Sequence, residues 1–318
     1  MNKVRGFFGS KKTKGNGGSP DDKDKKTPDK HGLLKEPWRC LGRKGTWTEK
    51  YAKELLSEIQ KHDFKKTDLS NIRILLLGPV SAGKSSFLNT VASIDTGRMS
   101  QITVAAGSSS STTSALKKYR PAEKLKNFCI LDTMGVEDSD QGGLNLKDVV
   151  YVVKGNIPPD YKFNPASPID EGNKDFRSDP NNKEKIHCVV FVSDANVIGQ
   201  NNISDATRAK IKALQDELKV IDIPRIVLLT KIDVLCKLVE ADIENVYKSP
   251  KVEEAVRLAQ ELYYIPEQNI FPVKNYENEM EMDFKKDILP LLALRQMINV
   301  GTDFFRSSSA ARDDDEEF

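Results

Sequence analysis

The stretch that decides the fold is Gly78-Pro79-Val80-Ser81-Ala82-Gly83-Lys84-Ser85, which matches the pattern G-x-x-x-x-G-K-S. The apolar run Ile72 to Leu77 precedes it and reads as a buried strand, and the segment from Ser85 to about Ile94 reads as a helix. A strand, a glycine-containing loop and a helix in this order direct backbone N–H groups and the helix dipole at a phosphate group. The stretch therefore predicts a phosphate-binding loop.

Two side chains in this loop have specific expected roles. Lys84 is expected to reach the β- and γ-phosphates of a nucleotide, and the Ser85 hydroxyl to ligate Mg²⁺. The other loop residues would surround the phosphates with their backbone N–H groups. The expected phosphate contacts are Gly78, Pro79, Val80, Ser81, Ala82, Gly83, Lys84, Ser85 and Ser86.

Around this loop the chain alternates short apolar runs with amphipathic segments, a pattern that predicts a mostly parallel sheet covered by helices on both faces. The expected fold class is therefore a three-layer α/β sandwich of the P-loop NTPase type. The expected strands are Ile72–Leu77, Ser114–Tyr119 at an edge, Phe128–Leu131, Val189–Val192, Ile226–Leu229 and Asn269–Val273. Besides Ser85–Ile94, the expected helices are Asp205–Leu218, Val252–Tyr263 and Asp287–Ile298.

A second motif, Asp132-Thr133-Met134-Gly135, follows a predicted strand. By itself D-x-x-G is common and most often marks a surface turn. Downstream of a phosphate-binding loop, however, Asp132 is expected to hold Mg²⁺ through water, and the Gly135 amide to sense the γ-phosphate.

A third motif, Thr230-Lys231-Ile232-Asp233, also directly follows an apolar strand. Here Asp233 would accept hydrogen bonds from the N1–H and N2 amino groups of guanine, and the stem of Lys231 would lie over the ring. Adenine offers no such pair of donors, so Asp233 predicts GTP or GDP as the ligand and a GTPase type of fold. Val273 and Lys274, which end the last strand, are expected to support the guanine from the other side.

The polar run from Ser108 to Ser114 is expected to close over Mg²⁺ and the γ-phosphate. Either Thr112 or Thr113 fits this role, and the sequence does not separate them. Thr113 is the one that we predict as a metal ligand. With Lys84 and Gly135, these threonines form the predicted catalytic set.

Composition limits the other classes of function. The chain has 318 residues, 38% of them hydrophobic, and a formal net charge of only +2, which is no signature of nucleic-acid binding. No apolar run approaches the roughly 20 residues needed to span a bilayer. The four cysteines and three histidines are scattered, so neither a disulfide framework nor a zinc site is expected.

Composition also predicts the domain organisation. Residues 1–35 are expected to be a disordered basic tail, a solubilising segment or a contact for an acidic membrane or RNA. Residues 36–70 are expected to pack on the main domain through a helix that starts at the capping box Thr46-Trp47-Thr48-Glu49 and ends near His62. Residues 71–306 would form the main domain, with an insertion near 137–185 that we read as a partly ordered flap. Residues 307–318 would be a disordered acidic tail.

Taken together, these residues resemble the interferon-induced protein 44 family. The resemblance extends from Glu36 to Phe305. It includes Glu36-Pro37-Trp38-Arg39, Leu76–Val80, Cys129–Gly135, Lys154–Pro165, Lys185–Cys188, Leu228–Asp233, Phe271–Tyr276 and Asp303-Phe304-Phe305. It implies a cytoplasmic GTP-binding protein that is induced in the innate antiviral response. Some relatives carry an additional amino-terminal TLDc domain, which we do not expect in this chain because only a short polar segment precedes Glu36.

Two aliphatic residues predict slow hydrolysis. Val136 follows Gly135, where efficient small GTPases commonly place a glutamine that orients water, and Val80 stands where they often have glycine. Neither side chain can orient water by hydrogen bonding. Any acceleration is expected to come from self-association or a protein partner.

The sequence leaves two functions of different kinds in competition. The first is a GTP·Mg-binding switch or scaffold in antiviral defence, with slow turnover. The second is a non-catalytic interaction protein in which nucleotide binding is structural or vestigial. An ATP-driven enzyme ranks third, because of Asp233.

Overall fold

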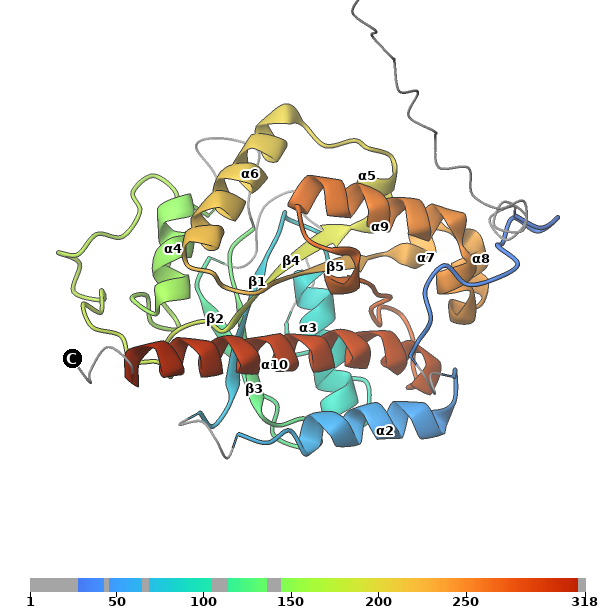
Figure 1. Ribbon diagram of the computed structural model, residues 1–318, viewed down its shortest axis with the longest axis horizontal. Coiled ribbons are helices and arrows are strands. Elements are labelled where there is room, and N and C mark those ends of the chain that lie inside the picture. The colour runs from blue at the N-terminus through green and yellow to red at the C-terminus, as the bar shows by residue number, and fades with distance from the viewer. Residues whose placement is uncertain (1–27, 43–45, 65–68, 104–113, 136–143, 314–318) are drawn as a thin grey trace, which may run out of the picture.

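The computed structural model describes residues 28–42, 46–64, 69–103, 114–135 and 144–313, with side chains as far as residue 308 (Figure 1). Its centre is a six-stranded sheet with the order β2-β3-β1-β4-β5-β6. The strands are β1 (Ile72–Leu77), β2 (Lys117–Tyr119), β3 (Phe128–Asp132), β4 (Cys188–Asp194), β5 (Arg225–Thr230) and β6 (Ile270–Pro272). All neighbouring pairs are parallel except β2 with β3. The predicted α/β fold class is confirmed.

The sheet forms where apolar runs can be buried on both faces. Every residue of β1 is buried, because β1 lies between β3 and β4 and has helices on both sides. The predicted edge strand Ser114–Tyr119 is shorter than expected. It is confined to β2, since Ala115 instead forms an isolated bridge with Lys162.

Helices cover both faces, with α2, α3 and α10 on one side and α4, α6 and α9 on the other (Figure 1). The short helices α5, α7 and α8 and two 3-10 turns connect them. The helices are α2 (Glu49–Gln60), α3 (Lys84–Thr96), α4 (Leu146–Lys154), α5 (Ala195–Gly199), α6 (Asp205–Val220), α7 (Ile232–Leu235), α8 (Lys237–Ala241), η1 (Ile243–Lys248), α9 (Pro250–Tyr263), η2 (Glu267–Asn269) and α10 (Phe284–Asp313).

Helix α2 packs on the main domain, as the pattern of its apolar residues predicts. It buries Tyr51, Leu55 and Ile59 and lies alongside α10 (Figure 1). Its predicted start was wrong, because the N-cap is Thr48 and not Thr46. The Thr48 hydroxyl accepts a hydrogen bond from the Tyr51 N–H, whereas Thr46 precedes the helix. Competing caps two residues apart are difficult to rank from sequence, since either hydroxyl can accept from the first turn.

The segment before α2 begins earlier than predicted. Leu34, inside the expected 1–35 tail, is buried, and its N–H donates to the carbonyl of Lys248. Arg39 donates to the carbonyls of Ile270 and Glu267, which ties the segment to the start of β6. The ring of Trp38 packs edge-on against Tyr247. Residues 28–42 therefore belong to the folded domain, while residues 1–27 lie outside the described part of the chain.

Helix α10 runs past its predicted end at Ile298 to Asp313, so residues 307–313 of the expected acidic tail are helical. Gly301 lies inside the helix and faces the sheet. A Cβ there would lie 2.8 Å from Ile72 Cγ2, so the glycine lets α10 approach β1 closely. No helix in the described residues is long and apolar enough to cross a membrane.

The described part of the 137–185 insertion is ordered around α4. This helix begins at Leu146, and Asn145 caps it. Asp148 is buried, and its carboxylate accepts from the Ile169 N–H, which fastens the returning chain onto the helix. Residues 136–143 lie outside the described residues.

Candidate functional site

The three sequence motifs meet at one edge of the sheet. The glycine-containing loop follows β1, Asp132 ends β3, Thr230 ends β5 and Val273 follows β6. These strands are parallel, so their carboxyl ends share that edge. Ligands of open α/β sheets bind outside this edge, where neighbouring loops diverge.

The phosphate end of the site contains a lysine folded onto its own loop. Lys84 Nζ donates to the carbonyl oxygens of Gly78, at 2.7 Å, and Pro79, at 2.8 Å. The residue is only 8% exposed. Burial lowers the pKa of its ammonium to about 8, and the nearby Asp132 carboxylate opposes the shift. A bound phosphate would supply a negative charge that compensates for the hydration that the ammonium loses on burial.

Asp132 is the most buried acid of this edge. It is 1% exposed, and neither of its side-chain oxygens has a hydrogen-bond partner. Burial raises the pKa of the carboxyl group to about 6, against the opposing effect of Lys84. A buried carboxylate without donors fits a hard divalent cation, which takes oxygen ligands. The residues present therefore fit Mg²⁺, with Ser85 at the start of α3 as the second protein oxygen.

Gly135 lies against the phosphate loop. A Cβ on Gly135 would fall 2.6 Å from Val80 Cγ2, so the glycine allows the β3 loop and the β1 loop to touch. Thr133, two residues earlier, is buried and donates through its hydroxyl to the Leu76 carbonyl at 2.9 Å. The structure thus brings Gly135 next to Val80. Thr112, Thr113 and Val136 lie outside the described residues.

Thr230 supports the phosphate-binding loop through its side-chain hydroxyl. Its hydroxyl lies 2.6 Å from the carbonyl oxygen of Ala82 and 3.2 Å from that of Ser193, and the residue is fully buried. The third motif predicts Thr230 as a nucleotide contact, yet its side chain forms hydrogen bonds within the protein. Thr230 therefore affects ligand binding indirectly, by holding the phosphate-binding loop in position.

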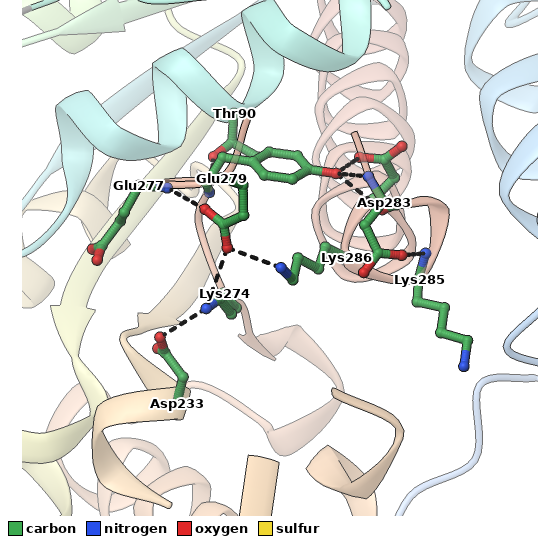
Figure 2. Close-up of polar contacts among 10 residues, drawn as sticks. Thr90, Asp233, Lys274, Glu277, Glu279, Asp283, Lys285 and Lys286 are labelled. Atoms are coloured by element: carbon green, nitrogen blue, oxygen red, sulfur yellow. Dashed lines mark hydrogen bonds and ion pairs between the residues drawn. The ribbon is translucent and has the colours of Figure 1, made fainter. Parts of the chain in front are cut away.

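The base end of the site is a chain of ion pairs (Figure 2). Lys274 Nζ lies 3.1 Å from Asp233 Oδ2 and 3.4 Å from Glu279 Oε1, and Lys286 Nζ lies 2.9 Å from the same Glu279 oxygen. Burial lowers the pKa of Lys274, but Asp233 and Glu279 outweigh it and hold this pKa above its usual value. The two predicted residues Asp233 and Lys274 are therefore brought together.

Lys231 is held by a residue that the sequence interpretation missed. Its Nζ lies 2.9 Å from Asp194 Oδ2 at the end of β4, and its backbone takes the left-handed conformation, with φ 58°. The sequence could have predicted Asp194 as a site residue, because it is a polar residue at the carboxyl end of an apolar strand. Glu279 and Lys286 carried none, since no motif connects them to Asp233.

The loop after β6 is fastened to the phosphate loop and to α3. Asn275 Nδ2 donates to the Gly83 carbonyl at 3.3 Å, while the buried Asn275 Oδ1 has no partner. The Tyr276 N–H donates to the Thr90 hydroxyl of α3 at 3.0 Å (Figure 2). Val273 is fully buried, and its N–H donates to the Leu229 carbonyl. The base end and the phosphate end are thus mechanically linked.

Two cavities flank this edge. One, of about 560 Å³, lies beside the phosphate loop, and its lining includes Val80, Asp194, Ile198 and Lys231. The other, of about 570 Å³, lies between α3 and the loop after β6. Its lining includes Ser86, Asn89, Tyr276 and Glu279. The second cavity connects a predicted phosphate contact, Ser86, with the chain of ion pairs.

The family model described as 50S ribosome-binding GTPase matches residues 73–231, half of the chain. The chain therefore belongs to this GTPase family.

Three curated sequence relatives narrow the group. The chain is 35% identical to human interferon-induced protein 44-like over 79% of its own length and 56% of the relative. It is 34% identical to human interferon-induced protein 44, over 79% of the chain and 57% of the relative, and 32% identical to the mouse protein, over 73% and 55%. The resemblance to the interferon-induced protein 44 family is confirmed, and the chain spans just over half the length of these relatives.

Solved structures of GTP-binding proteins also align with the chain. A probable GTP-binding protein engB has 15% identity and a TM-score of 0.36, over 70% of this chain and 98% of that one. The ADP-ribosylation factor-like small COPII coat GTPase SAR1 of Encephalitozoon cuniculi, in complex with GDP, has 14% identity and a TM-score of 0.36, over 80% and 90%.

Proposed function

We propose that this protein binds GTP and GDP with Mg²⁺ and acts as a slow GTPase switch or scaffold in the interferon-linked antiviral response, in the cytoplasm. Membership of a GTPase family supports the ligand, and the names of its relatives support the setting. The observation that carries the proposal is the pair formed by Lys84 and Asp132, two buried charged groups at the carboxyl edge of the sheet.

Each residue of the site has a role in this proposal. Lys84 moves from the loop carbonyls to the β- and γ-phosphates, and Ser85 and Asp132 hold Mg²⁺. When bound, the metal supplies positive charge that neutralises the phosphate oxygens. Asp233 reads the guanine edge, while Lys231 and the backbone around Lys274 enclose the base. One threonine of the pair Thr112 and Thr113 closes the site over the metal.

Slow turnover follows from the aliphatic side chains near the reacting phosphate. Val80 lies in the phosphate loop against Gly135, and Val136 comes next in the sequence. Neither offers a hydrogen bond to an attacking water. Acceleration then requires a residue from a second copy of the chain or from a protein partner.

The test combines light scattering with phosphate-release kinetics in the ligand-free, GDP-bound and GTP-analogue-bound states. We expect slow phosphate release by the monomer, and a larger particle or a faster rate in the state that self-associates. A monomer that hydrolyses GTP as fast as a partner-activated GTPase would contradict the proposal.

One observation favours the alternative, a non-catalytic interaction protein with vestigial nucleotide binding. The Lys84 ammonium is already satisfied by two loop carbonyls, so the phosphate loop is stable without a ligand. Titration with GTP separates the two functions. Roughly micromolar or tighter binding, about −8 kcal/mol, that disappears in Lys84→Ala supports the switch, and no detectable binding supports the interaction protein.

A further inference from the structure

One lysine at the base end is shared between two carboxylates. The Lys274 ammonium lies between Asp233 and Glu279, at 3.1 Å and 3.4 Å (Figure 2). All three side chains are mostly buried, with exposed fractions of 16%, 14% and 19%. A buried ammonium that loses its only counter-charge is strongly destabilising. Lys274 can leave Asp233 without that penalty, because Glu279 is already beside it.

We propose that Glu279 is a positioning residue of the guanine site, which takes over the Lys274 ammonium from Asp233 when a guanine base binds. This inference rests on the guanine-nucleotide binding proposed above and adds a specificity device to the same site. In this structure Lys274 neutralises Asp233, and a guanine base would replace Lys274 as the partner of this carboxylate.

The chemistry of guanine favours the exchange. Its N1–H and N2 amino group are two adjacent donors, and a carboxylate binds both most directly when both of its oxygens face the base. In this structure Asp233 Oδ2 faces Lys274. A base that offers both donors competes with the ammonium for this oxygen, whereas a base that lacks them does not.

Glu279 is fixed in place to receive the lysine. One of its oxygens accepts from Lys286 and the other, Oε2, accepts from the Glu277 N–H at 2.8 Å. Burial raises the pKa of Glu279, but these hydrogen bonds outweigh it and lower the pKa to about 2, so the group stays ionised. Tyr276 anchors the same loop, since its hydroxyl accepts from the Asp283 N–H and donates to Asp287 Oδ1.

The experiment is a double-mutant cycle on the full chain, read by calorimetric titration with GDP and with inosine diphosphate, which lacks the N2 amino group. In Glu279→Gln the lysine has no second carboxylate and stays on Asp233. We expect the Kd for GDP to rise about tenfold and the preference for GDP over inosine diphosphate to narrow. In the Lys274→Met background, the Glu279→Gln change should alter the Kd less than about twofold. Each expected factor corresponds to ordinary charge-pair coupling between neighbouring residues.

The matched control is Glu277→Gln, which removes the same charge from the same loop. The Glu277 side chain is exposed and contributes only its backbone N–H to the ion-pair chain, so GDP affinity should not change. The conservative Glu279→Asp variant keeps a carboxylate for Lys274 and should recover most of the affinity.

Two results would overturn the inference while guanine binding stands. One is an unchanged Kd in Glu279→Gln, and the other is an equal loss in the wild-type and Lys274→Met backgrounds, which would show that Glu279 acts only on loop stability. A wild-type protein that binds neither nucleotide would instead overturn the proposed function, and the inference with it.

Discussion

The two ends of the site differ in how their charges are satisfied. At the phosphate end, Asp132 is buried without a hydrogen bond, and Lys84 rests on backbone carbonyls. At the base end, Asp233, Lys274, Glu279 and Lys286 form a continuous chain of ion pairs. At the phosphate end, therefore, a phosphate and a cation would neutralise the buried charges. At the base end the charges are already paired, and a base must displace one of the ion-pair partners. Affinity should come from the first end and selectivity from the second.

The largest expected effect is at the phosphate end. Lys84→Ala removes the cation that would form charge-assisted hydrogen bonds with two phosphates, so GTP affinity should fall roughly 1000-fold or more, about 4 kcal/mol. Calorimetric titration measures it. Lys53→Ala is the control, because Lys53 lies on the exposed side of α2, in a surface pair with Glu49. Equal GTP affinities in the two variants would show that Lys84 does not bind the phosphates.

The second prediction concerns the pH dependence of ligand-free stability. The folded-state pKa of Asp132 is raised from 3.8 to about 6, so the folded form binds a proton that the unfolded chain has already lost between these pH values. Stability should therefore fall as the pH rises from about 4 to 6, by up to roughly 3 kcal/mol for this group.

Urea unfolding at successive pH values measures this effect. Asp132→Asn should make the loss of stability in that window smaller but not abolish it, because the pKa of Asp287 is also raised to about 6 by burial. Asp216→Asn, at an exposed site on α6, should leave the curve unchanged. Equal losses of stability in the wild type and in Asp132→Asn would show that burial of the Asp132 carboxylate does not destabilise the folded protein.

The third prediction addresses the base end. Asp233→Asn replaces an acceptor by a group that donates, so GDP affinity should fall about 30-fold, roughly 2 kcal/mol, and the preference for GTP over ATP should narrow by a similar factor. Xanthosine diphosphate, which presents an acceptor where guanine has its N2 amino group, should bind the variant better than GDP. Competition titration measures the affinities of all four nucleotides, and a variant that keeps the full GTP preference would show that Asp233 does not recognise the base.

The smallest expected effect is at the brace between the ends. Thr230→Val removes a buried hydroxyl that lies within hydrogen-bond distance of the Ala82 and Ser193 carbonyls. The free energy of unfolding should fall by about 1 kcal/mol, and GDP affinity several-fold, because the phosphate loop loses its support. Chemical denaturation with a parallel GDP titration checks both. Lower stability with unchanged GDP affinity would show that the Thr230 hydroxyl stabilises the fold but does not position the nucleotide site.

The sequence was sufficient for the sheet and for the phosphate end. Runs such as Ile72–Leu77 are buried on both faces, which makes their apolar character continuous and their position in a parallel sheet easy to predict. The order of the motifs then places Lys84, Asp132 and Asp233 at one edge, because parallel strands share their carboxyl ends. These are local patterns joined by a single topological rule.

The remainder depends on packing between distant segments. Glu279 meets Lys274 only because Tyr276 fastens its loop to α10 and α3, and no spacing in the sequence encodes that path. Thr48 in place of Thr46 as the cap of α2 depends on which hydroxyl reaches the first turn. The role of Gly301 depends on the contact between α10 and β1, where a Cβ would lie too close to Ile72.

Recognition of the guanine base is the property on which the proposed function depends, and a comparison of two nucleotides measures it. Ligand-free wild-type protein is titrated with GDP and with ADP in the presence of Mg²⁺, in parallel, by calorimetry. We expect GDP to bind with a Kd of roughly 1 μM or lower and ADP to bind at least about 100-fold more weakly. Equal affinities for the two nucleotides, or no heat with either, would contradict it.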